Sequence, residues 1–376
     1  MSKVPRVLSE VAPLMKRNII EDFDIPEGNM QMAKRIQEYL DRGGKYVRPA
    51  IVYSTVKSYT PERINDFLWP ALSLQYDHNF FLIHDDFEDG SFFRRGKFTM
   101  HLLYGDDFAI NYGDYLRTLA ELAMDKSIET LGKDKYIKLV RARHEMLKIT
   151  AEGQDLELLL RSLPLSEMTE EKIFEILEKK TPFYTLFTPY RYGGIISDLP
   201  DVDINSLKCH LISLGISFQI RDDVLDLIKP KEEETGKATL EEQRFGKDWL
   251  GDLEEIKRTL PLVKVVNYAN PTDKKYLFEM LDFDGKMVKL VKQRNELRLQ
   301  RFGKDDNRYK KIQDEIDSIK VRVVELMHKY NAIEESQSVA YELYQNNINY
   351  IKDALPTSEG KEELLELFHF LVHREF

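Results

Sequence analysis

The stretch HNFFLIHDDFEDGSFFRRGK, which runs from His78 to Lys97, determines how the rest of the chain is interpreted. An apolar run is followed by three aspartates and an arginine pair, Asp85, Asp86, Asp89, Arg94 and Arg95. On a helix, Asp85 and Asp89 lie one turn apart on the same face. Two carboxylates this close repel each other and need a cation between them, and oxygen ligands of this kind suit Mg²⁺.

A magnesium ion held by a few carboxylates usually completes its coordination with water and phosphate oxygens. The arginine pair would then meet the other face of the same phosphate. Alone, the stretch is also compatible with a helix end that carries solvated charges. A second aspartate triplet in FQIRDDVLDL, formed by Asp222, Asp223 and Asp226, favours the metal site. Two such motifs on two helices predict one pocket between them.

Composition limits the class of protein. The chain has 376 residues, of which 42% are apolar and 32% charged, with only 18 Gly and 14 Pro. It is long enough to bury a sizeable core, and helical periodicity dominates. The net charge of −10 argues against general nucleic-acid binding. We find no transmembrane run and no signal peptide. The single cysteine, Cys209, indicates a reducing cytoplasm, and we expect its side chain to be buried.

Basic and polar residues recur at helical spacing near these motifs. In GGKYVRP, Lys45 and Arg48 share one face at the start of a helix, where they would hold a diphosphate or remain solvated. His78 lies two turns before Asp85, so a packed core residue and a ligand-binding residue are both open for it. Gln219 lies within two turns before the second triplet and points toward the same surface.

The order of helices follows from apolar periodicity and from glycine and proline breaks. We predict helices over residues 29–41, 67–89, 99–125 with a break at Gly105, 134–160, 169–195 with a restart at Pro182, and 204–228. Residues 229–246 are charged and predict a mobile loop or lid. Residues 283–326 predict an exposed, charged helical hairpin. We interpret residues 1–376 as a single domain.

Together, these motifs resemble those of the trans-type isoprenyl diphosphate synthases, also called polyprenyl synthetases. The resemblance covers nearly the whole chain. It rests on GGKYVRP, DDFEDGSFFRRG, Lys180–Thr181, FQIRDDVLD, the segment FGKDWLGDLEEIKRTL and the C-terminal run LPTSEGKEELLELFHFLVHREF. It implies an all-α, isoprenoid synthase-type antiparallel helix bundle around a deep apolar cavity, usually in a homodimer.

The resemblance also implies an activity. A short-chain trans-prenyl diphosphate synthase condenses isopentenyl diphosphate head-to-tail with allylic diphosphates, namely dimethylallyl, geranyl or farnesyl diphosphate. The steps are Mg²⁺-dependent ionisation, condensation and elimination. The expected product is geranylgeranyl (C20) or farnesyl (C15) diphosphate. The leaving diphosphate gains negative charge, so cations placed there stabilise the transition state more than the ground state.

Residue roles carry over from the matching motifs. Asp85 and Asp89 would bind two Mg²⁺ ions with support from Asp86, and Asp222 would bind a third, oriented by Asp223 and Asp226. The allylic diphosphate would be held by Arg94, Lys180, Lys247 and Lys257, and isopentenyl diphosphate by Lys45, Arg48, His78 and Arg95. Thr181 and Gln219 would face the developing carbocation.

The chain departs from the family pattern at several positions. Phe98 stands where the family usually has proline, and Ile256 replaces a common glycine before Lys257. We expect both to alter only the local backbone. The loop at 229–246 is longer than usual, so Lys237 competes with Lys247 as the first lysine. The spacing to Lys257 favours Lys247. The hairpin near 283–326 resembles an insertion.

Product length is predicted from the helix that carries the first motif. Phe81 lies one turn before Asp85, with Phe80 beside it, and their rings would form the floor of the cavity or simply pack in the core. Two aromatics at these positions resemble farnesyl-producing enzymes, while the surrounding residues also suit geranylgeranyl enzymes. We therefore expect a short product.

Three other readings remain. A class I terpene cyclase needs no second diphosphate site, so Lys45, Arg48, His78 and Arg95 argue against it. The same residues disfavour a head-to-head synthase. A non-catalytic subunit of a hetero-oligomeric prenyl synthase tends to lose one aspartate motif, whereas both are intact here.

Overall fold

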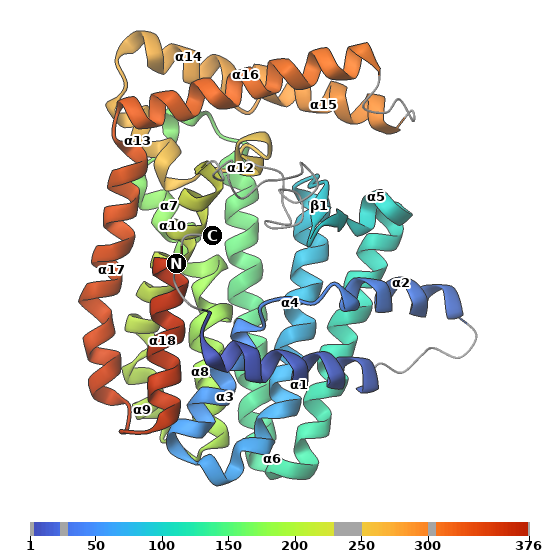
Figure 1. Cartoon of the computed structure of the whole chain (residues 1–376), viewed down its shortest axis with the longest axis vertical. Coiled ribbons are helices and arrows are strands. Elements are labelled where there is room, and N and C mark those ends of the chain that lie inside the picture. Colours follow the sequence, from blue (N-terminus) through green and yellow to red (C-terminus); the bar gives the residue numbers. More distant parts are fainter. Residues whose placement is uncertain (1–3, 23–28, 229–249, 300–305, 375–376) are drawn as a thin grey trace.

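Two long central helices carry the two aspartate motifs and bring them to the same end of the molecule (Figure 1). The computed structural model describes residues 4–22, 29–228, 250–299 and 306–374. Helix α4 (Leu68–Glu88) packs most extensively against α6 (Asp106–Arg161), and α10 (Lys208–Leu227) packs against α17 (Ala332–Ala354). Because both motifs end their helices, both triplets lie at one rim of the bundle.

The remaining helices surround this central set. Most pack as a bundle whose long members run nearly parallel or antiparallel in Figure 1. They are α1 (Arg6–Asp22), α2 (Met30–Asp41), α3 (Val47–Tyr59), η1 (Pro61–Phe67), α5 (Met100–Tyr104), η2 (Leu165–Glu167), α7 (Glu170–Lys180), η3 (Phe183–Phe187), α8 (Thr188–Ile196), α9 (Asp201–Ser206), α12 (Gly251–Glu254), α13 (Leu260–Tyr268), α14 (Pro271–Leu281), α15 (Lys286–Leu299), α16 (Asn307–Lys329) and α18 (Glu359–His373). The predicted all-α class is confirmed.

The predicted helix breaks are also confirmed. Gly105 separates α5 from α6 with a φ of 102°, a conformation that favours glycine. The two helices predicted around residues 99–125 and 134–160 form one long helix, α6, which is interrupted at Gly132 where φ is 77°. Pro182 lies between α7 and η3, as its missing N–H requires.

A two-residue β-hairpin follows the first motif, and the sequence did not predict it. Strand β1 (Phe93–Arg94) pairs antiparallel with β2 (Lys97–Phe98). Arg95 and Gly96 form its turn with φ values of 55° and 75°, as two-residue hairpins prefer. Phe98, which departs from the family pattern, pairs with Phe93 across the hairpin, and their rings stack with centroids 4.9 Å apart.

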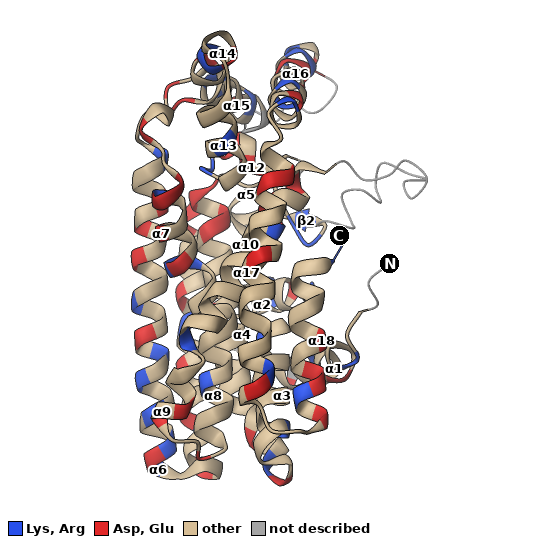
Figure 2. Cartoon of the chain, turned by 90° about the vertical axis from the view of Figure 1, so that its left-hand side faces the viewer, with Lys and Arg blue, Asp and Glu red and all other residues tan. Residues whose placement is uncertain are grey.

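The charged segment at 283–326 forms the predicted helical hairpin. Helices α15 and α16 lie side by side across the end of the bundle that carries the aspartate motifs (Figures 1 and 2). Acidic and basic segments gather below them, where α10 and α12 meet (Figure 2). We call α15 and α16 the end hairpin.

Two sequence expectations have other outcomes. The prediction that Cys209 is buried is wrong: its side chain is exposed, because Cys209 is the second residue of α10 and lies on the outer face there. The charged loop at 229–246 and both candidate lysines, Lys237 and Lys247, lie outside the described residues. No described helix is both long enough and apolar enough to cross a membrane.

Candidate active site

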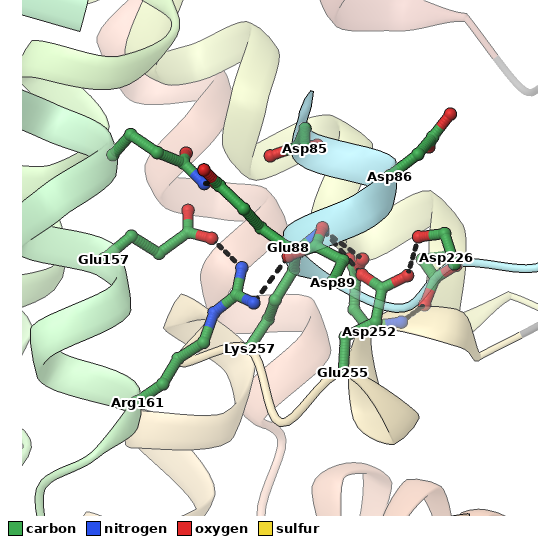
Figure 3. A network of polar contacts seen from close by, with 12 residues as sticks. Asp85, Asp86, Glu88, Asp89, Glu157, Arg161, Asp226, Asp252, Glu255 and Lys257 are labelled. Atoms are coloured by element: carbon green, nitrogen blue, oxygen red, sulfur yellow. Dashed lines mark hydrogen bonds and ion pairs between the residues drawn. The ribbon is translucent and has the colours of Figure 1, made fainter. Parts of the chain in front are cut away.

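Each carboxylate of the first motif has a different cationic partner, and Figure 3 shows those of Asp89. Asp85 accepts from Lys180 at 3.0 Å. Asp89, at the C-cap of α4, is paired with Arg161 at 2.5 Å and with Lys257 at 2.9 Å. Burial alone would lower the pKa of Lys257, but Asp89 and Glu255 raise it well above its ordinary value. These cations therefore remain charged and neutralise the motif.

The third carboxylate, Asp86, is buried and faces the β-hairpin. Arg94 binds it through two guanidinium nitrogens, one of them at 2.9 Å. Arg95 lies in the turn of the hairpin with a positive φ, and its side chain donates to Asn79 at 3.2 Å rather than to Asp86. The adjacent arginines thus serve two different parts of the site.

Lys180 reaches the first motif because α6 and α7 approach closely. A Cβ atom at Gly153 would lie 2.7 Å from the backbone nitrogen of Lys180, so only glycine fits at this position. One turn later on α6, Glu157 accepts from Lys180 at 2.9 Å and also pairs with Arg161. Burial alone would raise the pKa of Glu157, but Lys180 and Arg161 lower it.

The second motif is held by a separate set of contacts. Asp222 pairs with Arg374, close to the C-terminus, and Gln219 donates to Asp223 at 2.9 Å. Asp226 accepts from the backbone nitrogen of Asp252 at 3.4 Å. Burial and the nearby carboxylate of Asp252 raise the pKa of Asp223 to about 8.

Lys257 connects the two motifs. Its ammonium lies 2.9 Å from Asp89 and 3.6 Å from Asp252, which contacts Asp226 of the second motif (Figure 3). The sequence predicted that the two triplets face one pocket. The chain of contacts from Asp89 through Lys257 and Asp252 to Asp226 places them in one network.

The carboxylates are suited to a divalent cation. In the described residues no group of three or more His, Cys, Asp or Glu side chains is already arranged around one metal position. The donor set is nevertheless the one that Mg²⁺ prefers. Burial is the main cause of the raised pKa of Asp223 and the carboxylate of Asp252 adds to it; a bound cation would favour the charged form of both carboxylates.

A second cationic group lies farther from the acidic network. Buried Arg48 donates to Thr185 at 2.8 Å and lies over the ring of Tyr184 at 4.2 Å. Burial lowers the pKa of Arg48 and, helped by neighbouring Arg94, that of Arg95. Within the described residues, neither arginine forms an ion pair with a carboxylate. This pattern is typical of an anion site.

His78 belongs to the same group. Its ring lies 6.2 Å from that of Tyr184, and its buried Nδ1 has no hydrogen-bond partner among the described residues. Burial, together with Arg48 and Arg95, lowers the pKa of His78 well below its ordinary value. Lys45, the remaining predicted member, has an exposed side chain at the start of α3.

The predicted chain-length residues lie one turn before the first motif. The ring of Phe81 contacts that of Tyr184 edge-on at 5.3 Å, and Phe80 contacts both Phe81 and His84. Both side chains are half-buried. Thr181 is buried at the C-cap of α7. The deep apolar cavity itself stays a prediction.

The structure adds residues that the sequence did not single out. Arg161, Glu157, Glu255 and Arg374 pair with predicted site residues. Glu157 and Arg161 lie outside the quoted motifs, whereas Glu255 and Arg374 lie inside quoted segments but were given no role. For Glu157 and Arg161, the only sequence signal is Gly153 and helical spacing after it. Nothing in the sequence links Arg374 to Asp222, which lies 152 residues earlier.

Known proteins with the same architecture are enzymes of isoprenoid synthesis. The family model for polyprenyl synthetase matches residues 29–297. Geranylgeranyl diphosphate synthase of Saccharolobus solfataricus is 30% identical over 240 residues, covering 64% of this chain and 68% of the relative. Short chain isoprenyl diphosphate synthase of Methanothermobacter thermautotrophicus is 27% identical over 375 residues. This match covers 98% of this chain and 97% of the relative.

A solved structure agrees with these sequence matches. The crystal structure of geranylgeranyl pyrophosphate synthetase from Pyrococcus horikoshii superposes with a TM-score of 0.74. It shares 27% sequence identity and covers 98% of this chain and 97% of its own chain.

Proposed function

This chain belongs to the polyprenyl synthetase family, and from that premise we propose that it is a short-chain trans-prenyl diphosphate synthase. As a prenyltransferase it joins isopentenyl diphosphate head-to-tail to an allylic diphosphate. The observation that carries this proposal is the presence of two separate cationic groups. Lys180 and Lys257 pair with the aspartates of the first motif, while Arg48 and Arg95 bind the uncharged side chains of Thr185 and Asn79.

The two groups suit two diphosphates with different fates. The allylic diphosphate is to leave, so it belongs beside Arg94, Lys180 and Lys257, where positive charge already balances carboxylates. Mg²⁺ held by Asp85, Asp89 and Asp222 supplies Lewis-acid neutralisation of the leaving group when bound. Isopentenyl diphosphate keeps its diphosphate and belongs beside Arg48, Arg95, His78 and Lys45.

We assign the reacting carbons to Thr181 and Gln219. Thr181 and Gln219 supply hydroxyl and carbonyl dipoles that stabilise a carbocation without capturing it. The apolar side chains of α4 and η3 keep water away from it. The site offers no obvious protein base for the final proton loss, which we assign to the released diphosphate.

We infer the product to be C20 or C15, because Phe80 and Phe81 lie just before the first motif. We also infer a homodimer. Apolar side chains are exposed along neighbouring α5 and α6, among them Leu103, Phe108, Ile110, Leu122 and Ile128. A second copy of this chain would cover them, and light scattering in solution should give twice the mass of one chain. A cytoplasmic location belongs to the same proposal.

The reaction class is tested by the substrate requirement for diphosphate release. Purified protein with MgCl₂ should release diphosphate only when geranyl diphosphate and isopentenyl diphosphate are both present. Chelation of Mg²⁺ should abolish release. Release from geranyl diphosphate alone would assign the class I terpene cyclase. A folded protein that releases none from any allylic substrate would assign the non-catalytic subunit.

A further inference from the structure

Two residues that precede Lys257 have an unfavourable backbone conformation with positive φ. Leu250, at the N-cap of α12, has a φ of 56°, and Ile256 has a φ of 54°. A left-handed conformation is unfavourable for an L-residue, and a β-branched side chain adapts to it poorly. Such geometry persists only where the surrounding structure fixes it. Ile256 therefore needs external support to place Lys257 against Asp89.

The end hairpin supplies that support at Glu254. Arg294 of α15 donates to one carboxylate oxygen of Glu254 at 2.5 Å, and Lys320 of α16 pairs with the other. The side chains of Arg294 and Lys320 are each 4% exposed and that of Glu254 is 9% exposed. A buried carboxylate held from both helices ties α12 firmly to the hairpin, because breaking a buried pair is costly.

Arg294 also reaches the segment that follows the first motif. Its guanidinium lies 5.2 Å from the ring centroid of buried Phe92, three residues after Asp89. It donates as well to Gln313 at 3.1 Å on the other helix of the hairpin. Arg294 thus contacts both Phe92, which follows Asp89 in the chain, and Glu254, which precedes Lys257.

Glu255 links the residues after Asp89 to Lys257. Ser91 donates to Glu255 at 2.7 Å, and the other oxygen of Glu255 lies 2.7 Å from Lys257. Glu254 is therefore held from outside by the hairpin, while its neighbour Glu255 joins the residues after Asp89 to Lys257.

We propose that Arg294 and Lys320 are positioning residues, which hold α12 so that Lys257 stays aligned with Asp89 at the allylic diphosphate site. This gives the charged end hairpin a role in the reaction, and it rests on the proposed function. We assign both residues a role through Glu254 and α12 rather than through contact with the substrate. Their removal should weaken the allylic site and leave the distant group around Arg48 and Arg95 unchanged.

The test compares Arg294→Met with Lys286→Ala. Lys286 pairs with Glu315 inside the same hairpin, where both side chains are well exposed, so its variant perturbs the hairpin without touching α12. Arg294→Lys is the conservative variant, which keeps the charge toward Glu254. Hydrogen–deuterium exchange is measured on substrate-free protein, and KM and kcat are measured separately for geranyl diphosphate and isopentenyl diphosphate.

We expect Arg294→Met to speed exchange in residues 250–258 and 89–93. It should lower kcat/KM for geranyl diphosphate by about tenfold or more, because a small misplacement of a charged group is costly. KM for isopentenyl diphosphate should stay within about twofold, since that site lies elsewhere. Lys286→Ala should resemble wild type, and Arg294→Lys should recover part of the loss. If Arg294→Met does not fold, faster exchange in the same two segments of Arg294→Lys is the expected result.

Unchanged exchange in residues 250–258 of a folded Arg294 variant would overturn the proposal, as would equal losses for both substrates. Failure of the proposed function looks different. In that case wild type and Lys286→Ala are inactive as well, while the exchange experiment still reports whether Arg294 fixes α12.

Discussion

The ammonium of Lys257 lies 2.9 Å from Asp89, so a predicted diphosphate ligand and a predicted metal ligand neutralise each other. Lys180 and Asp85 repeat this relationship at 3.0 Å. On the proposed function, a diphosphate that arrives with Mg²⁺ would offer each group a new partner: the carboxylates would turn to the metal and the lysines to the phosphate. Substrate binding at this site is therefore an exchange of partners within a network that is already charged.

Replacement of Lys257 should impair the reaction far more than folding. In Lys257→Gln, Asp89 keeps its ion pair with Arg161, so the carboxylate is not left alone. We expect kcat/KM for the allylic diphosphate to fall by about 100-fold or more, as when one preorganised contact to a developing charge is lost. Steady-state kinetics and a melting curve check this. Lys292→Gln, an exposed lysine on α15, is the matched control. Near-normal kinetics in Lys257→Gln would remove Lys257 from the site.

Replacement of Arg95 should weaken substrate binding without lowering the stability of the protein. It is buried, donates to Asn79, and has a pKa lowered mainly by burial, so its charge is held at a cost without substrate. We expect Arg95→Gln to keep or raise the Tm, while KM for isopentenyl diphosphate rises about tenfold or more. Arg94→Gln should instead lower the Tm, because it removes the guanidinium that pairs with buried Asp86. If Arg95→Gln instead raises KM for the allylic substrate alone, the assignment of the two sites is reversed.

His78 should make the substrate-free protein less stable in acid. Burial and neighbouring arginines lower its pKa well below the ordinary 6.5. Below pH 6.5 the unfolded chain binds a proton at this position that the folded chain does not, so the free energy of unfolding falls as pH falls. Stability from this group is complete above pH 6.5. Denaturant unfolding at pH 7.5 and pH 5.5 should show a smaller loss for His78→Gln than for wild type. Equal losses would contradict the buried, neutral histidine.

Phe81 and Phe80 should limit product length. The ring of Phe81 contacts Tyr184 of η3, and Phe80 contacts Phe81. We predict that both rings limit the apolar cavity expected next to Asp85. We expect Phe81→Ala to lengthen the product, and Phe81→Ala with Phe80→Ala to lengthen it further. Chromatography of dephosphorylated products measures this. Phe278→Ala, on α14 away from α4, is the control. Unchanged products in both variants would mean that the rings only pack the core.

The sequence predicted the parts of the site that lie on one helix face. Helical spacing predicted that Asp85 and Asp89 share a face and that Gln219 points toward the second triplet. In the structure, Asp85 accepts from Lys180 and Gln219 donates to Asp223. Gly105 and Pro182 correctly predicted helix breaks, because glycine readily adopts a positive φ and proline lacks a backbone N–H. Local rules of this kind act over one or two turns.

The partners of those residues could not be predicted, because they depend on tertiary packing. Arg161 reaches Asp89 across 72 residues of chain, and the guanidinium of Arg374 reaches Asp222 from the far end. The replacement of glycine by Ile256 was expected to change only the backbone locally. Ile256 adopts a positive φ, which is a local change of the backbone. The contacts of Glu254 with Arg294 and Lys320, which no single motif reveals, connect the segment of Lys257 to the end hairpin.

Product analysis tests the central claim most directly. The purified protein is incubated with MgCl₂, labelled isopentenyl diphosphate and, in separate reactions, dimethylallyl, geranyl or farnesyl diphosphate. The products are dephosphorylated and sized. A C15 or C20 alcohol that requires Mg²⁺ is the predicted result. A cyclic hydrocarbon formed without isopentenyl diphosphate, or no product from a folded protein with any primer, would contradict the account.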